Sequence, residues 1–219
     1  MITRPCRSIV LALASAAVLS LASGGTWAAD SPTDDPHAKH RAMMNSRSTE
    51  AKTTEVELRN FPMTTQDGDV VRFRTDVVGD KIVVMDFVYT TCTTVCPVIS
   101  AIFQQVQQGL DERPEAEARL ISISIDPGRD TPLRLKEYAD KFHANDNWIW
   151  LTGEKSTVDD VLRGLGAYTP DFEDHPSIVL VGDPRSGTWK RFFGFPSPKK
   201  ILAAVDEMSA NRNAAYAVN

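Results

Sequence analysis

The stretch Asp86–Ser100, DFVYTTCTTVCPVIS, places two cysteines, Cys92 and Cys96, between a strand and a helix. The residues ahead of the cysteines, 81–89, are nearly continuously apolar and β-branched, which predicts a central strand covered on both faces. After the cysteines, apolar residues recur every three to four positions as far as Leu110, and Pro97 suits the first turn of a helix. The two thiols are therefore expected at the carboxyl end of a strand, where open α/β sheets place their sites.

The segments around this stretch alternate between strand and helix patterns. A β-hairpin is predicted ahead of it, with strands at 55–58 and 70–73 around a turn at 66–69. Further strands are predicted at 119–125, 148–151, 177–181 and 189–193, and further helices at 131–142, 158–165 and 198–208. This order implies parallel strands with right-handed crossovers, to which the hairpins add antiparallel strands. The fold class is α/β: a single thioredoxin-like domain, a central mixed sheet flanked by helices, with a β-hairpin near the N-terminus of the domain.

Residues 1–28 have the pattern of an export signal. Arg4 and Arg7 form a short basic start, an apolar run of 15 residues follows from Ser8 to Ala22, and Ala28 supplies a small residue for cleavage. A membrane-spanning helix usually needs about 20 apolar residues, so cleavage is favoured, and a retained anchor that associates with the membrane is the alternative. We expect an exported protein in the periplasm or on the periplasmic face of the inner membrane.

Three further segments follow the signal. Residues 29–53 are polar and read as a flexible tether, residues 54–210 form the domain, and residues 211–219 are expected as a C-terminal tail. The tether carries four imidazole or thioether side chains, the groups that bind copper: His37, His40, Met43 and Met44. A metal-collecting arm and a plain linker both explain this composition.

The net charge and the cysteine content narrow the range of possible functions. Without residues 1–28 the chain has 22 basic and 29 acidic residues, a net charge of −7, which argues against a nucleic-acid partner. Cleavage also removes Cys6, so Cys92 and Cys96 become the only thiols. A chain of this size buries a substantial core without disulfides, and two cysteines this close would close a loop too small to stabilise much. Chemistry explains the pair better than a structural disulfide does.

The position of the cysteines at a helix start, and the three residues between Cys92 and Cys96, favour a metal site. A helix N-terminus lowers thiol pKa values, so both cysteines are expected to ionise more easily than a free cysteine. Their spacing places the Cβ atoms roughly 5–6 Å apart if both are helical, which a metal ion spans more easily than a disulfide. Two thiolates select a soft metal, Cu(I) or zinc. Reversible oxidation of the pair stays open.

A third ligand is sought among the histidines. His143 lies at the polar end of a helix and is expected on the surface. His175, in Asp174-His175-Pro176, directly precedes a buried strand, at the loop that faces the cysteines in a thioredoxin-like fold. Asp174 is a candidate to orient the imidazole.

Several carboxylates have structural explanations. Asp86 is the exception within the apolar run IVVMDFVY at 82–89, so it is expected to face a cation or water or to lie near the edge of the core. Asp126, Arg129 and Asp130 are explained by an ion pair and a helix cap within one loop, in preference to metal ligation, because carboxylates suit soft metals poorly.

Three signatures in order resemble the SCO/SenC family of copper-binding cytochrome c oxidase assembly proteins. They are TTCTTVCP at 90–97, SIDPGRDTP at 124–132, and DH at 174–175 just before SIVLV. The resemblance covers about residues 55–208. It implies a copper chaperone that binds copper, as Cu(I), Cu(II) or both, through Cys92, Cys96 and His175. The copper-bearing subunit of cytochrome c oxidase would be the recipient, at its dinuclear copper centre. Pro176 departs from the family pattern, which often has a small polar residue there.

A thiol-disulfide oxidoreductase is the alternative function. The same two thiols, Cys92 and Cys96, would then be redox-active and reduce cysteines of a partner, with a thioredoxin-like protein as reductant. The two hypotheses differ at His175, because disulfide exchange needs only the sulfurs.

Overall fold

The computed structural model describes residues 50–217. The predicted export signal and most of the predicted tether, with His37, His40, Met43 and Met44, lie outside the described residues. The helical and extended elements are, in order, β1 Lys52–Thr53, β2 Pro62–Thr65, β3 Val70–Arg72, η1 Phe73–Val78, β4 Ile82–Val88, α2 Val95–Asp111, η2 Pro114–Ala116, β5 Ala118–Ser124, α3 Pro132–Asp140, β6 Trp148–Thr152, α4 Lys155–Gly164, η3 Phe172–Asp174, β7 Ile178–Asp183, β8 Thr188–Phe193 and α5 Pro198–Ala217.

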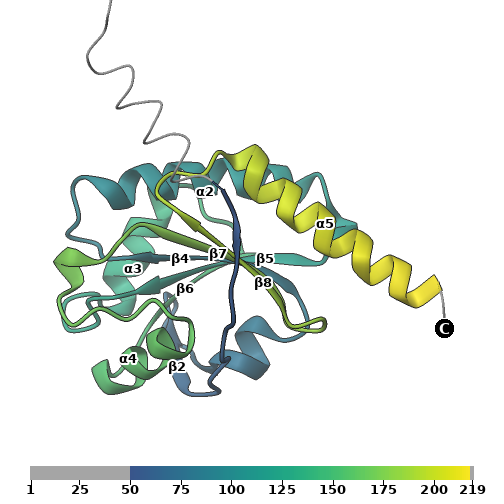
Figure 1. Ribbon diagram of the computed structural model, residues 1–219. Helices are drawn as coiled ribbons and strands as arrows, with labels where there is room; N and C mark the ends of the chain where they lie inside the picture. The colour runs from purple at the N-terminus through teal and green to yellow at the C-terminus, as the bar shows by residue number, and fades with distance from the viewer. Residues whose placement is uncertain (1–49, 218–219) are drawn as a thin grey trace, which may run out of the picture. The chain divides into compact units, whose positions relative to one another are not determined.

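The strands form one mixed sheet in the order β1-β8-β7-β4-β5-β6-β2-β3. Strands β4, β5 and β6 are parallel to one another, as their helical crossovers require, and the other pairs are antiparallel. Strand β4 is central and completely buried, in agreement with its continuous apolar sequence. Figure 1 shows this strand in the middle of the sheet.

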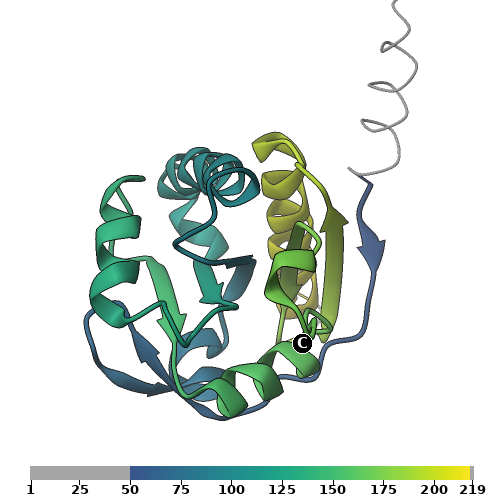
Figure 2. The same ribbon diagram turned by 90° about the vertical axis from the view of Figure 1, so that its left-hand side faces the viewer.

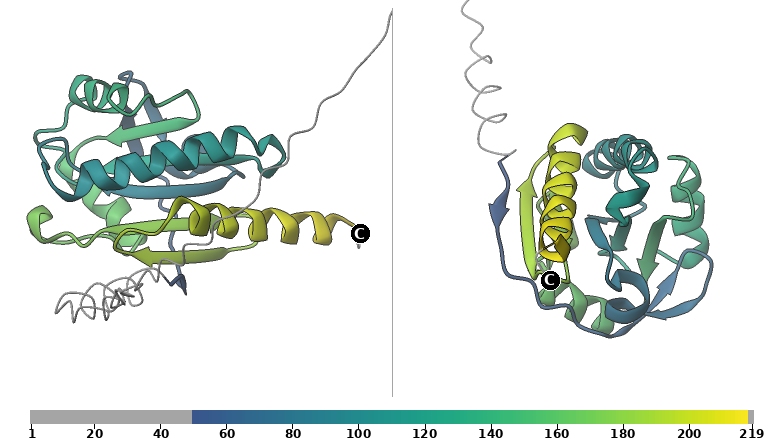
Figure 3. Two further views of the ribbon diagram at one scale, coloured as in Figure 1. Left: turned by 90° about the horizontal axis from the view of Figure 1, so that it is seen from above. Right: turned by 90° about the vertical axis from the view of Figure 1, so that its right-hand side faces the viewer.

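Two apolar layers cover the two faces of the sheet. Residues of β4 alternate between them, with Val84 in one layer and Met85 in the other. Helices α2, α3 and α5 cover the first face, where α2 and α5 lie side by side, and α4 covers the second (Figures 2 and 3). This arrangement is the predicted fold class, a thioredoxin-like domain with a mixed sheet, flanking helices and an N-terminal hairpin.

The predicted hairpin exists, but its first strand begins later in the sequence than predicted. The turn at 66–69 is confirmed, because Thr65 N–H donates to the Asp69 carbonyl at 2.9 Å, yet the strand that pairs with β3 is β2, Pro62–Thr65. The alternation at 55–58 has another cause. This segment packs along α4, where Glu57 N–H donates to the Gly164 carbonyl at 2.9 Å and Val56 contacts the second apolar layer.

The two ends of the described domain also differ from the prediction. Lys52 and Thr53, expected in the tether, pair with β8 as β1. Helix α5, expected to end at Met208 and to be followed by a tail from residue 211, continues to Ala217. The reason lies in Arg212, which is 9% exposed, donates to the Asp80 carbonyl at 2.8 Å and forms an ion pair with the buried Asp183. These contacts anchor the last turns of the helix to the domain.

Candidate metal and thiol site

The cysteine loop lies between the end of β4 and the start of α2. Cys92 N–H donates to the Tyr89 carbonyl at 3.1 Å, which closes a turn just ahead of the helix. Cys96 lies in the first turn of α2, and its N–H, which has no partner within the helix, donates to Cys92 Sγ at 3.3 Å. Both cysteines are free thiols and buried. The helix N-terminus therefore holds the Cys92 sulfur, as its position in the sequence indicated.

The two thiols differ in acidity. Burial opposes ionisation of Cys92, but hydrogen bonds from the backbone and thiol of Cys96 outweigh it and lower the pKa of Cys92 to about 7. Burial dominates at Cys96 and raises its pKa, and the nearby Cys92 and Asp86 add to the effect. The predicted lowering therefore holds for Cys92 and is wrong for Cys96, because only the first sulfur accepts an amide from the helix start while the second lies deeper in the apolar layer.

His175 reaches the same region from a distant part of the sequence, between η3 and β7. It caps η3 in the extended conformation that suits a residue before proline, and its N–H donates to the Phe172 carbonyl at 3.2 Å. The ring is held by Ala167, whose carbonyl accepts from Nε2 at 2.9 Å, and it lies 5.6 Å from the Phe87 ring, centroid to centroid. Burial lowers the pKa of His175, and the Ala167 bond partly opposes this. A neutral ring with its proton on Nε2 leaves the Nδ1 lone pair free to bind a ligand.

Cys92, Cys96 and His175 line one cavity of about 90 Å³, whose wall is otherwise a mixture of apolar and polar side chains that includes Glu173. The fold thus brings together the three side chains that the sequence singled out. Among residues 50–217, no three His, Cys, Asp or Glu side chains are close enough to hold one metal ion. His143, expected at the surface, is exposed and does not line this cavity.

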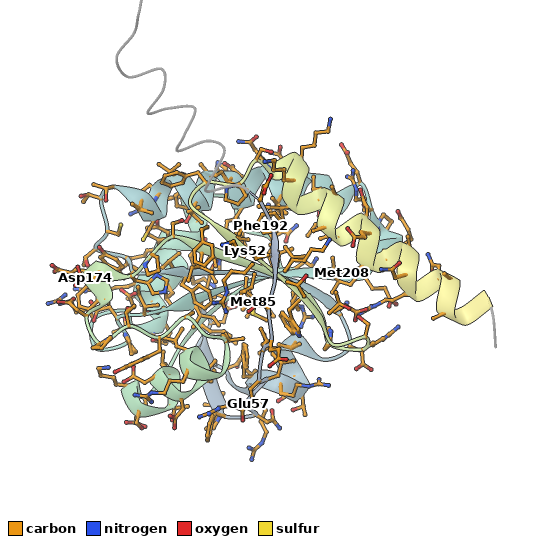
Figure 4. All side chains as sticks on the ribbon, in the orientation of Figure 1. Lys52, Glu57, Met85, Asp174, Phe192 and Met208 are labelled. Carbon is orange, nitrogen blue, oxygen red and sulfur yellow. The ribbon has the colours of Figure 1, made fainter. Side chains whose placement is uncertain are left out.

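The carboxylates behave mostly as predicted. Arg129 pairs with Asp126 at 3.1 Å, and Thr131 caps α3 by accepting from Arg134 N–H at 3.3 Å, so the ion pair and the helix cap are confirmed. Asp174 is exposed, and Figure 4 labels it at the rim of the molecule, away from Met85 in the centre of the sheet. The partner of the His175 ring is therefore the Ala167 carbonyl, in place of the predicted Asp174.

Comparison with known proteins identifies the family. Residues 49–210 match the sequence profile of the family described as SCO1/SenC. The chain belongs to the SCO1/SenC family. The SCO1 protein homolog of Bacillus subtilis is 34% identical over 135 residues, which cover 58% of this chain and 68% of that protein. A putative copper-binding protein of Stutzerimonas stutzeri is 28% identical over 94 residues, which cover 43% of this chain and 45% of that protein.

A solved structure of the same family has the same fold. It is BsSco, described as a member of the Sco family of cytochrome c oxidase assembly proteins and studied for a disulfide switch. The TM-score is 0.62 at 26% identity, and the match covers 74% of this chain and 98% of BsSco. The thioredoxin-like architecture of this SCO1/SenC chain is therefore that of its relatives.

Asp86 departs from the expectation that it faces a cation, water or the core edge. It is completely buried, and Oδ1 accepts from Ser122 Oγ at 2.5 Å. Ser122 Oγ in turn accepts from Trp148 Nε1 at 2.8 Å, whereas Asp86 Oδ2 has no partner within the described residues. Burial raises the pKa of Asp86 to about 7, against the effect of the Ser122 bond. The expectation of a solvated position rests on the cost of burying a charged carboxylate, and protonation of the carboxyl group removes that cost.

Sequence reasoning missed two further parts of the site. Asp130 is completely buried and accepts from Thr90 N–H and from Ser124 Oγ, so it touches the cysteine loop directly. The alternating Ser122 and Ser124 inside a buried strand were the available signal, because a buried hydroxyl needs a partner. Ala167 gives no sequence signal, since it acts through its backbone carbonyl.

No helix in residues 50–217 is both long enough and apolar enough to cross a membrane.

Proposed function

We propose that this SCO1/SenC protein is a copper chaperone that binds copper through Cys92, Cys96 and His175. The observation that carries the proposal is that these three side chains, from distant parts of the chain, line one cavity. Membership of a family with a relative described as copper-binding, and with a member described as an oxidase assembly protein, supports the choice of metal and the role. Two thiolates and an imidazole are a donor set for copper.

The contacts of each ligand define what metal binding requires. His175 would bind through Nδ1, because Nε2–H is held by the Ala167 carbonyl, the kind of outer partner that fixes a ligating ring. The thiol of Cys96 has a raised pKa, so copper binding must displace its proton. Since the three side chains do not yet converge closely enough for one ion, binding would draw the His175 segment and the cysteine loop together.

Delivery is proposed to the dinuclear copper centre on the copper-bearing subunit of cytochrome c oxidase. All three ligands lie on or next to loops at one end of the central strands β4 and β7, where the side chains of a docked protein could take over the metal one bond at a time. The thiols must be reduced to bind Cu(I), which assigns a role to a thioredoxin-like reductant. Residues 1–28 would export the protein to the periplasm, or hold it at the periplasmic face of the inner membrane if they are retained.

The test is copper titration of the full chain, with a chromophoric Cu(I) chelator as competitor. We expect one tightly bound copper per chain and a sharp loss of affinity in His175→Ala. His143→Ala is the matched control, because His143 is exposed and away from the cavity, and it should bind as wild type does. Equal affinity in all three proteins would overturn the three-ligand proposal.

A second function, thiol-disulfide exchange, is favoured by one specific observation. The pKa of Cys92 is lowered to about 7 while that of Cys96 is raised, the asymmetry of an attacking thiolate and a buried resolving thiol. Cys92 thiolate would attack a partner disulfide, and Cys96 would then release the reduced partner as the Cys92–Cys96 disulfide forms. Rapid exchange that persists in His175→Ala, together with weak copper binding by wild type, would favour this function over the first.

A further inference from the structure

The loop at residues 126–130, between β5 and α3, holds the cysteine loop through a buried carboxylate. Asp130 is completely buried, and its Oδ1 accepts from Thr90 N–H at 3.1 Å and from Thr90 Oγ1 at 2.5 Å. Its Oδ2 accepts from Ser124 Oγ at 2.7 Å. Within residues 50–217, this carboxylate is held by hydrogen bonds and by no ion pair. The neighbouring Arg129 forms its ion pair with Asp126.

These bonds act on the turn that presents Cys92. Thr90 is a central residue of the turn that Cys92 N–H closes on the Tyr89 carbonyl. Asp130 binds both the backbone N–H and the hydroxyl of Thr90, so it fixes the orientation of the chain two residues ahead of the sulfur. Hydrogen bonds to a charged acceptor are stronger than neutral ones, and burial protects them from water.

The same loop also contacts the segment that carries His175. The Arg129 guanidinium lies over the Phe172 ring, 5.4 Å from its centroid, and the Phe172 and Tyr89 rings pack in a T-shaped arrangement with their centroids 5.1 Å apart. The Phe172 carbonyl accepts from His175 N–H at 3.2 Å. One short loop thus contacts both halves of the candidate copper site.

We propose that this loop is a bracket that sets the distance between the two thiols and His175, with Asp130 and Arg129 as positioning residues. Asp130 would hold the cysteine turn, and Arg129 would hold the Phe172 turn that ends at His175. The inference rests on the proposed copper site. It gives the SIDPGRDTP stretch at 124–132 a role in metal binding without making any of its carboxylates a ligand.

The opposite end of strands β4 and β7 supplies a matched control. Asp183, at the end of β7, is also a buried carboxylate, and it pairs with Arg212 far along the chain from the cysteines. Since β7 runs antiparallel to β4, with Val83 opposite Gly182, Asp183 lies beside the start of β4 whereas the cysteines follow its end. Asp183→Asn therefore weakens the fold at a distance from the site, whereas Asp130→Asn acts beside it.

The experiment compares full-chain wild type, Asp130→Asn, Arg129→Ala and Asp183→Asn. Copper affinity is measured by chelator competition, and the thiolate-to-Cu(II) charge-transfer band reports the ligand geometry. We expect Asp130→Asn to weaken copper binding about 10-fold to 100-fold, as loss of an outer-shell partner does, and to shift the band. Arg129→Ala should weaken binding about twofold to fivefold, the size of an exposed cation–π contact. Asp183→Asn should lose stability and keep both affinity and band.

Hydrogen exchange of the copper-free protein separates the possible failures. If Asp130 holds the turn, exchange at Thr90 and Cys92 amides should speed up in Asp130→Asn and stay unchanged in Asp183→Asn. Wild-type exchange and wild-type affinity in Asp130→Asn would overturn the bracket while leaving the copper site intact. Insensitivity of copper binding to His175→Ala would instead overturn the three-ligand proposal and the Arg129 half of the bracket. Should Asp130→Asn fail to fold, Thr90→Val and Ser124→Ala remove single bonds to the carboxylate and test the same claim.

Discussion

The acidity of Cys92 leads to a quantitative prediction for the reduced, copper-free protein. A pKa of about 7 makes half of the Cys92 thiol ionised at pH 7. A free cysteine with a pKa of about 8.5 is about 3% ionised at that pH, so Cys92 holds about 15 times more thiolate. Intrinsic nucleophilicity falls with pKa at a Brønsted slope of about 0.4–0.5, which removes about fivefold. The net alkylation rate at pH 7 should therefore be only about three times that of a free cysteine.

The decisive quantity is the pH midpoint of the reaction. Alkylation with a small haloacetamide is followed by mass spectrometry, which assigns the label to Cys92 and Cys96 separately. Cys92 should show a midpoint near pH 7, and it should keep a lowered midpoint in Cys96→Ser, because the amide at position 96 still donates to the sulfur. Cys96 should react slowly and only at alkaline pH, since burial raises its pKa. A shared midpoint near pH 8.5 for both thiols would refute this account of the helix start.

Three further predictions concern stability, measured by chemical denaturation. Folding raises the pKa of Asp86 to about 7, so the stabilisation that the protonated acid gives is complete below about pH 4 and is lost as the pH rises through 7. The stability of Asp86→Asn relative to wild type should therefore increase by about 4 kcal/mol as the pH rises from below about 4 to above about 7. A difference that stays constant with pH would contradict the raised pKa. Gly182→Ala should cost about 1–3 kcal/mol, because the added Cβ would lie 2.0 Å from Trp189 Cε3. Arg212→Ala should cost about 3–5 kcal/mol, because it leaves Asp183 buried without its cation; a loss below 1 kcal/mol would show that α5 is not anchored there.

The central part of the fold could be predicted because each element carries its own pattern. Strand β4 is covered on both faces and is apolar throughout, and α2 begins next to Pro97 and has one apolar stripe. The peripheral strand β2 could not be placed in this way. Its sequence, PMTT, has no strong strand pattern. It is held by pairing with β6, which is distant in the sequence, and with β3, across the turn at 66–69.

The ligand candidates could be predicted from residue type and position, but their environments could not. Cys92, Cys96 and His175 occupy one cavity as expected. The difference in acidity between the two thiols depends on the direction of one local hydrogen bond, from the Cys96 amide to the Cys92 sulfur, and on how strongly the surrounding domain buries each sulfur. The spacing of the cysteines alone does not reveal either. The partner of His175 is a backbone carbonyl at Ala167, which residue identity cannot reveal.

X-ray absorption at the copper edge of the Cu(I)-loaded full chain identifies the atoms bound to the metal. We predict a first coordination shell of two sulfur atoms and one imidazole nitrogen, which becomes two sulfur atoms alone in His175→Ala and stays unchanged in His143→Ala. A wild-type shell of two sulfur atoms with no imidazole, or a nitrogen ligand that survives in His175→Ala, would contradict it.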